Sequence, residues 1–229
     1  MANALAWVVI LVMNALAGAG RLNGVRTGTP SEEHPTLFTP AGWAFSIWLL
    51  IFALLGGVVG AHVHAQWWRA APDGLLRACV ALGGALPLNA AAQCAWLFCW
   101  HWRRWRLSLL AMWLLVLPSV ALAYARLDVD YRPVPHVLAR APLQVWLLQP
   151  AFSVYLAWIC CASLANVFVT AHALGFTAVD RQARYSAAAM ALTAALAVAV
   201  LLARADVPFV AVVIWALLAI AANQRARSS

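Results

Sequence analysis

The chain has 229 residues, of which 66% are hydrophobic and only 10% are charged. Several apolar runs approach the ~20 residues that a helix needs to cross the hydrocarbon core of a bilayer. This composition argues against a soluble domain and predicts an all-α integral membrane protein that crosses the membrane several times.

The formal net charge of +8 comes entirely from arginine, because the sequence has 15 Arg and no Lys. The arginines lie between the apolar runs, where such residues orient helices and contact lipid headgroups, so membrane lipids are expected partners and nucleic acid is not. If seven helices cross the membrane, the loops on the side of the C-terminus carry nine arginines against six. The positive-inside rule then places the C-terminus inside, and the kind of membrane stays open.

Several function classes are excluded or disfavoured by missing residues. A chain without lysine cannot form a retinal Schiff base. All seven acidic residues lie in predicted loops or at helix ends, so a proton or sodium relay lacks its usual carboxylates. Six histidines near helix ends could ligate haem iron, although His62 and His64 would diverge on a helix. The five cysteines fall in predicted helices without metal-ligand spacing and are expected to be reduced.

Seven apolar runs are candidate membrane spans. The first lacks the basic segment that precedes the apolar stretch of a secretory signal, so it is interpreted as a helix. The last two are short and are expected to form a hairpin turned at residues 204–208. In chain order the runs are 3–19, 41–61, 75–100, 107–125, 142–170, 187–203 and 208–222.

The first two runs are joined by a loop of about twenty residues, 20–39, whose length is typical of a lid or binding segment. Thr39 and Pro40 favour a helix that begins there, with Thr39 capping the first turn. Phe45, Trp48 and Phe52 then follow at helical spacing and share one face. Their rings would line one wall of a site, or would contact lipid and neighbouring helices.

The second run also contains Gly56 and Gly60, a pair of small residues four positions apart. Such a pair permits the close approach of another helix, from the same chain or from a second copy. It is the sequence feature that points to a homodimer.

Neutral polar residues stand out within the third run. Asn89, Gln93, Trp96 and Trp100 recur at steps of four, three and four, which places two amides and two indoles on one helical face. Amides are costly in hydrocarbon unless they find partners, so this face is expected to look inward. Hydrogen bonds between helices and simple space filling are the alternative interpretation.

The fifth run carries a second stripe, formed by Tyr155, Trp158, Ala162 and Asn166. Ala162 removes bulk between a ring and an amide, so a flat apolar molecule could lie there. Pro150 precedes the stripe and is expected to kink the run or to mark a change of segment.

Three separated patterns now coincide. They are Pro40, Trp43, Phe45 and Trp48 in the second run, Leu88, Asn89, Trp96, Leu97 and Phe98 in the third, and Pro150, Tyr155, Trp158, Ala162 and Asn166 in the fifth. Together they resemble the translocator protein family, also called TspO/MBR or tryptophan-rich sensory proteins.

The resemblance covers about residues 1–172, which are expected to form a TspO-like bundle of five membrane helices. Residues 173–229, with two further predicted membrane helices, resemble the longer branch of the family. The chain departs from the short members because Pro40 stands alone where two adjacent prolines are usual. Four residues also separate Pro150 from Tyr155, which the short members place together.

The resemblance implies a pocket between helices, closed by the first loop, that binds a tetrapyrrole such as protoporphyrin or haem, or a sterol-like lipid. It implies no required cofactor, and the role would be sensing, sequestration or transport. The alternative is a structural accessory subunit of a larger membrane complex. Porphyrin degradation is the one enzymatic activity considered, and no acid–base pair supports it. The residues implied as the pocket lining are Trp43, Phe45, Trp48, Asn89, Trp96, Trp158, Ala162 and Asn166.

Overall fold

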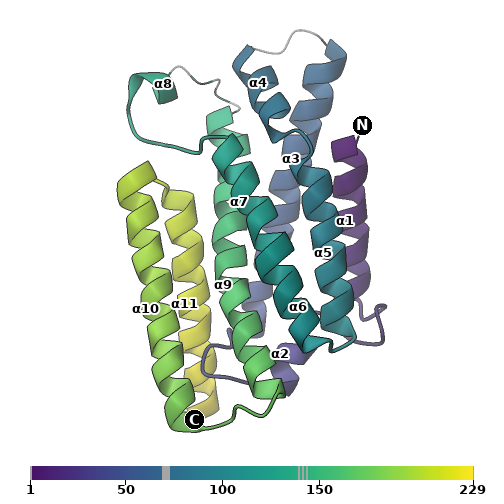
Figure 1. Cartoon of the computed structure of the whole chain (residues 1–229). Coiled ribbons are helices and arrows are strands. Elements are labelled where there is room, and N and C mark those ends of the chain that lie inside the picture. The colour runs from purple at the N-terminus through teal and green to yellow at the C-terminus, as the bar shows by residue number, and fades with distance from the viewer. Residues whose placement is uncertain (1, 69–72, 139, 141, 143, 229) are drawn as a thin grey trace.

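The computed structural model describes residues 2–68, 73–138, 140, 142 and 144–228, which form a bundle of helices (Figure 1). The α-helices are α1 (Ala2–Gly18), α2 (Thr29–Glu33), α3 (Ile47–Trp68), α4 (Asp73–Leu82), α5 (Ala85–His101), α6 (Trp105–Ala111), α7 (Leu117–Arg126), α8 (Pro135–Leu138), α9 (Gln149–Ala173), α10 (Val179–Arg204) and α11 (Val207–Ser228). A 3₁₀-helix, η1 (Gly42–Ser46), leads into α3, and π-helical turns, η2 (Met112–Val116) and η3 (Gln144–Leu148), lead into α7 and α9.

Five helical segments within the described residues are long and apolar enough to cross a membrane. They are Gly42–His64, Trp105–Arg126, Gln144–Ala173, Arg181–Arg204 and Val207–Arg227. The apolar helix α1 is shorter, with 17 residues. The expected all-α, multi-pass integral membrane protein is therefore confirmed.

The third predicted span is wrong as a single helix. Gly83 separates α4 from α5 and has a φ of +46°, a left-handed conformation that ends a helix and that glycine adopts without strain. The apolar run 75–100 does not reveal this break, because hydropathy averages over it. The resulting α5 has 17 residues, including the polar stripe predicted from spacing.

The second span begins differently from the sequence prediction. The chain enters it through η1, whose N-cap is Ala41 without a side-chain hydrogen bond. The Thr39 hydroxyl instead accepts a hydrogen bond from the backbone N–H of Thr36 at 2.9 Å. Thr39 therefore stabilises the end of the loop rather than the first turn of the helix. Pro150 lies where η3 passes into α9, in agreement with the predicted change of segment.

The central element of the bundle is α9, which packs against α3, α6, α7 and α11. On one side α1 packs against α5, and on the other α10 packs against α11 (Figure 1). The C-terminal hairpin is thus joined to the rest of the bundle mainly through α11. The boundary at residue 172 between a core and an extension stays a prediction.

Gly56 makes its close approach within the chain. A Cβ at this position would lie 2.9 Å from Cζ2 of Trp7, so any larger residue would force the indole of α1 to shift. A Cβ on Gly60 would meet nothing within 4 Å in the described part of the chain. The two glycines therefore do not form one seam inside the bundle, and the homodimer stays a prediction.

Candidate ligand-binding pocket

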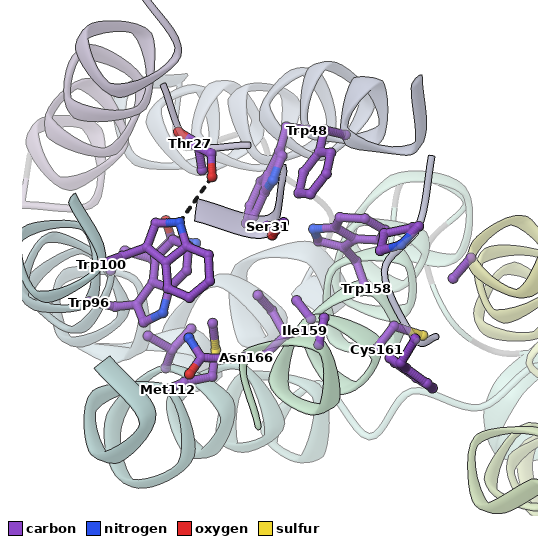
Figure 2. Close-up of a pocket in the computed structure, with 18 of the residues that line it drawn as sticks. Thr27, Ser31, Trp48, Trp96, Trp100, Met112, Trp158, Ile159, Cys161 and Asn166 are labelled. Carbon is purple, nitrogen blue, oxygen red and sulfur yellow. Dashed lines mark hydrogen bonds between the residues drawn. The ribbon is translucent and has the colours of Figure 1, made fainter. Parts of the chain in front are cut away.

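An aromatic pocket lies between α3, α5, α9 and α11, beneath the loop of residues 19–41 (Figure 2). Trp96 and Trp100 stack on one side, with ring centroids 5.5 Å apart and planes 23° from parallel. Trp158 forms the other side and meets Phe45 edge to face at 5.8 Å and Trp48 at 6.3 Å. The helical spacing of these rings was predicted, and tertiary packing brings them round one space.

The first loop, which the sequence predicts to be a lid or binding segment, covers this space. Its backbone reaches the pocket at Thr27, whose carbonyl accepts a hydrogen bond from Nε1 of Trp100 at 2.9 Å. Phe38, which is almost fully buried, stacks on Phe168 of α9 with centroids 5.0 Å apart. Ser31 of α2 adds a hydroxyl to the lining. The loop is therefore packed into the bundle and is part of the pocket wall.

Two polar contacts also tie the loop to the helix ends around it. Glu33 receives two hydrogen bonds from the Arg103 guanidinium, at 2.5 and 3.1 Å. Nδ1 of His34 lies 3.4 Å from Nδ1 of His172 at the end of α9. Burial lowers the pKa of His34, and the facing His172 lowers it further. The neutral form of His34 is therefore favoured in the closed loop.

The C-terminal helix α11 completes the pocket. Ala216 and Ile220 of this helix line it. One turn further on, the Asn223 amide donates to the backbone carbonyl of Thr39 at 2.9 Å. Gln224 donates to the carbonyl of Thr36 and Trp215 to that of Ala44, each at 3.2 Å, so α11 binds the backbone at three points from residue 36 to residue 44. The sequence analysis did not predict that α11 contributes to the pocket, because none of the three motif patterns lies in this helix. The predicted extension is thus a structural part of the site.

Six of the eight predicted residues line the pocket: Phe45, Trp48, Trp96, Trp158, Ala162 and Asn166. The prediction that Trp43 lines the pocket is corrected, because Trp43 lies outside the pocket wall with 46% of its surface exposed. Its ring meets that of Trp215 on α11 edge to face, with centroids 4.6 Å apart. The 3₁₀ geometry of η1 turns Trp43 towards α11, away from the helical stripe that begins at Phe45.

The prediction that Asn89 lines the pocket is also corrected, because Asn89 belongs to a buried hydrogen-bond network outside the pocket lining. Tyr155 donates to its carbonyl oxygen at 2.8 Å, and its amide nitrogen donates to Ser119 at 2.9 Å. Gln93 donates to the Tyr155 hydroxyl and accepts from Asn14 at 3.3 Å. The network joins α1, α5, α7 and α9, so the alternative interpretation, hydrogen bonds between helices, holds for Asn89.

Some lining residues were missed by the site prediction although the sequence contained a signal. Gln93 and Trp100 were placed on the inward stripe with Trp96, and both line the pocket. Cys161 and Ile159 lie beside the predicted Trp158 stripe and also line it. Helical spacing selects only positions on one line along a helix, whereas the wall of a pocket between several helices also includes the positions beside that line.

Three donors in the wall have no hydrogen-bond partner among the described residues, although their atoms are buried. They are Nε1 of Trp96, Nε1 of Trp158 and the amide nitrogen of Asn166. Unpaired buried donors cost free energy, and each would gain from a ligand that brings an acceptor oxygen. Figure 2 shows Trp96 and Asn166 on one side of the space and Trp158 on the other.

The closed pocket is small. Its free volume is about 50 Å³, whereas pockets for ligands of drug size have about 300–1,000 Å³. A second cavity of about 450 Å³ lies between α1, the loop and α3. The two cavities share Thr27, Phe45 and Trp48 as lining residues, so these side chains form the partition between them.

The fold, the covering loop and the aromatic pocket can now be compared with known proteins. A scan of protein families matches residues 1–229 to the family described as TSPO-like protein. The match extends beyond residue 172 and includes the C-terminal hairpin that the sequence motifs left out. No curated protein and no solved structure gave a significant match. Because the match covers the whole chain, the protein belongs to the TSPO-like family.

Proposed function

We propose that this protein binds a flat, largely apolar ligand, a tetrapyrrole or a sterol-like lipid, in the aromatic pocket for sensing, sequestration or transport. The observation that carries the proposal is the set of three unpaired donors in an otherwise apolar aromatic wall. A site that served packing alone would have no use for donors without acceptors.

The chemistry of the wall suits such a ligand. Indole rings stack on a planar macrocycle or cover the face of a fused-ring lipid. The donors of Trp96, Trp158 and Asn166 are complementary to carboxylate, carbonyl or hydroxyl oxygens at a ligand's edge. Ala162 leaves space between Trp158 and Asn166 on the same helix. The proposal is one of binding, and it assigns no catalytic step.

Access to the pocket requires a side-chain movement, because the closed pocket is too small for either ligand. Rotation of Trp48 and Phe45 would join the pocket to the cavity between α1 and α3. Leu49, which lines that cavity, is 75% exposed and therefore faces lipid in a membrane. An apolar ligand would thus come from the bilayer between α1 and α3, and the covering loop would stay in place.

The test is a titration of the purified full-length protein with protoporphyrin, haem and cholesterol, with tryptophan fluorescence as the readout for the tetrapyrroles. Cholesterol is measured by its competition with them. Trp158→Phe keeps a ring but removes one donor, and Ala162→Phe fills the pocket. Trp146→Phe is the matched control, because Trp146 is 80% exposed and lies outside the pocket.

We expect saturable quenching in the wild type and in Trp146→Phe, weaker binding in Trp158→Phe, and none in Ala162→Phe. Loss of one hydrogen bond to a buried donor corresponds to about fivefold to tenfold weaker binding. Equal quenching in all four proteins would refute the pocket. Absence of binding, combined with stable copurification with a larger membrane complex, would favour the accessory-subunit hypothesis.

A further inference from the structure

A third cavity, with a different lining, is at the opposite end of the bundle from α2 (Figure 1). It has about 410 Å³ and is bounded by α4, the end of α7 and, further along the chain, His136, Arg140 and Gln144. Figure 1 shows α4 and α8 at the end where the N-terminus lies. The sequence motifs and the proposed function leave this cavity unexplained.

Arginines dominate its lining. Arg77 of α4, Arg126 of α7 and Arg140 contribute to it, and Asp128 is the one carboxylate among its described lining residues. That carboxylate is shared, because it accepts from Arg140 at 2.9 Å and from Arg204 at 2.9 Å. Among its described lining residues the cavity therefore has more guanidinium groups than carboxylates.

Arg140 is part of the structure of this cavity. Its side chain is only 8% exposed, and it binds Asp128 and the backbone carbonyl of Asp130 at 3.2 Å. Two of its donor groups are thus engaged, which fixes the guanidinium in place. A guanidinium held in this way is pre-organised and loses little entropy on binding an anion.

Arg126 differs from Arg140, because its guanidinium has no hydrogen-bond acceptor in the described part of the chain. It lies beside the turn between α4 and α5, where a Cβ on Gly83 would be 3.7 Å from its Nη1. The turn thus brings Arg126 close to α4, on which Arg77 is located. Guanidinium groups bind phosphate oxygens in a two-pronged geometry, which makes a phosphate their natural partner.

Exposed side chains on the elements that bound the cavity favour a position at the depth of lipid headgroups. Large apolar side chains on α4, α8 and η3, which each contribute residues to the lining, are exposed: Val80 by 70%, Leu138 by 72% and Trp146 by 80%. Tryptophan is enriched at the boundary between lipid and water, and leucine and valine at that level contact acyl chains. A bound phosphate would therefore have hydrocarbon next to it.

We propose that this cavity binds the phosphate group of an anionic membrane phospholipid, with Arg77 and Arg126 as its main ligands and Arg140 fixed behind them. The acyl chains lie against the exposed apolar side chains beside it. This site is independent of the aromatic pocket, and neither proposal depends on the other.

The test compares the full-length wild type with two double variants of equal charge. Arg77→Gln/Arg126→Gln removes the two ligands, and Arg181→Gln/Arg184→Gln removes two exposed arginines at the other end of the bundle. Native mass spectrometry and thermal stability are measured with phosphatidylglycerol, with phosphatidylcholine and with inorganic phosphate. Circular dichroism establishes that each variant is folded, and Arg126→Lys retains the charge without the two-pronged geometry.

We expect the wild type and the Arg181/Arg184 variant to retain phosphatidylglycerol in preference to phosphatidylcholine. Binding by the Arg77/Arg126 variant should be about 30-fold weaker, and by Arg126→Lys intermediate. If inorganic phosphate alone raised the thermal stability as much as phosphatidylglycerol does, the cavity would be a phosphate site for a soluble anion, and the phospholipid would be refuted as its ligand. Equal retention by all variants, or equal loss in both double variants, would overturn the proposal.

Discussion

Replacing Tyr155 by Phe should destabilise the folded protein, because the Tyr155 hydroxyl is the centre of the buried network between helices. It donates to Asn89 and accepts from Gln93, and the residue is only 1% exposed. Phe keeps the ring and its packing, so the change removes two hydrogen bonds and little else. The amides of Asn89 and Gln93 would each lose a partner within the bundle.

The magnitude follows from what such bonds contribute in membrane proteins. A hydrogen bond between membrane helices stabilises by about 0.6 kcal/mol on average and by about 1.7 kcal/mol at most. Two bonds therefore correspond to a loss of about 1–3 kcal/mol in the free energy of unfolding. The full burial of Tyr155 favours the upper half of this range, because water cannot replace the lost partner.

The assay is equilibrium unfolding of the purified protein in mixed micelles with increasing sodium dodecyl sulfate, followed by circular dichroism. Tyr185→Phe is the matched control, because Tyr185 is 57% exposed and its hydroxyl has no hydrogen-bond partner among the described residues. A double variant with Asn89→Leu should lose less than the sum of the single variants, because both changes remove the same bond. A loss below about 0.5 kcal/mol in Tyr155→Phe, or one equal to that of Tyr185→Phe, would refute the network's role.

Three further predictions concern other parts of the structure. Asp206→Ala should lower the free energy of unfolding by about 2–4 kcal/mol in the same assay, because this fully buried carboxylate caps α11 and accepts hydrogen bonds from two hydroxyls. A decrease below about 1 kcal/mol would contradict this role. Above pH 6.5, the ordinary pKa of histidine, His34 is neutral and stabilises the loop over the pocket. This stabilisation is lost as the pH falls from 6.5 through the lowered pKa of His34. After correction for the intrinsic exchange rate at each pH, the amides of α2 should therefore be less protected from hydrogen exchange at about pH 5.5 than at about pH 7.5. His34→Gln, which cannot be charged beside His172, should lose this difference in protection. Gly56→Val should lower the free energy of unfolding by about 1–3 kcal/mol, because the new side chain would overlap the Trp7 indole of α1, whereas Gly60→Val should have little effect. Equal decreases in the two variants would refute the assignment of the close helix contact to Gly56.

Much of the candidate site could be predicted from local spacing. The order of Asn89, Gln93, Trp96 and Trp100 fixes their directions round one helix axis, because successive residues turn by about 100°. All four are buried, as the inward stripe predicted. Which of them lines the pocket depends on the neighbouring helix: Gln93, Trp96 and Trp100 line it, whereas Asn89 accepts a hydrogen bond from Tyr155 of α9 and does not.

The departures from prediction all involve contacts between distant segments or a local change of helix geometry. Trp43 packs on Trp215, more than 170 positions away in the chain, and spacing within one helix contains no information about such a partner. The break at Gly83 depends on a left-handed backbone conformation that glycine permits but does not require.

The amino-acid sequence by itself determined the class of protein, the faces of the helices and the family motifs, because hydropathy and helical periodicity are properties of neighbouring residues. The tertiary structure alone decided that α11 closes the pocket, that the loop is held across it, and that arginines from three segments meet at the other end of the bundle. The physical reason is that a helix fixes the direction of each side chain about its own axis, while packing between helices decides what that side chain meets.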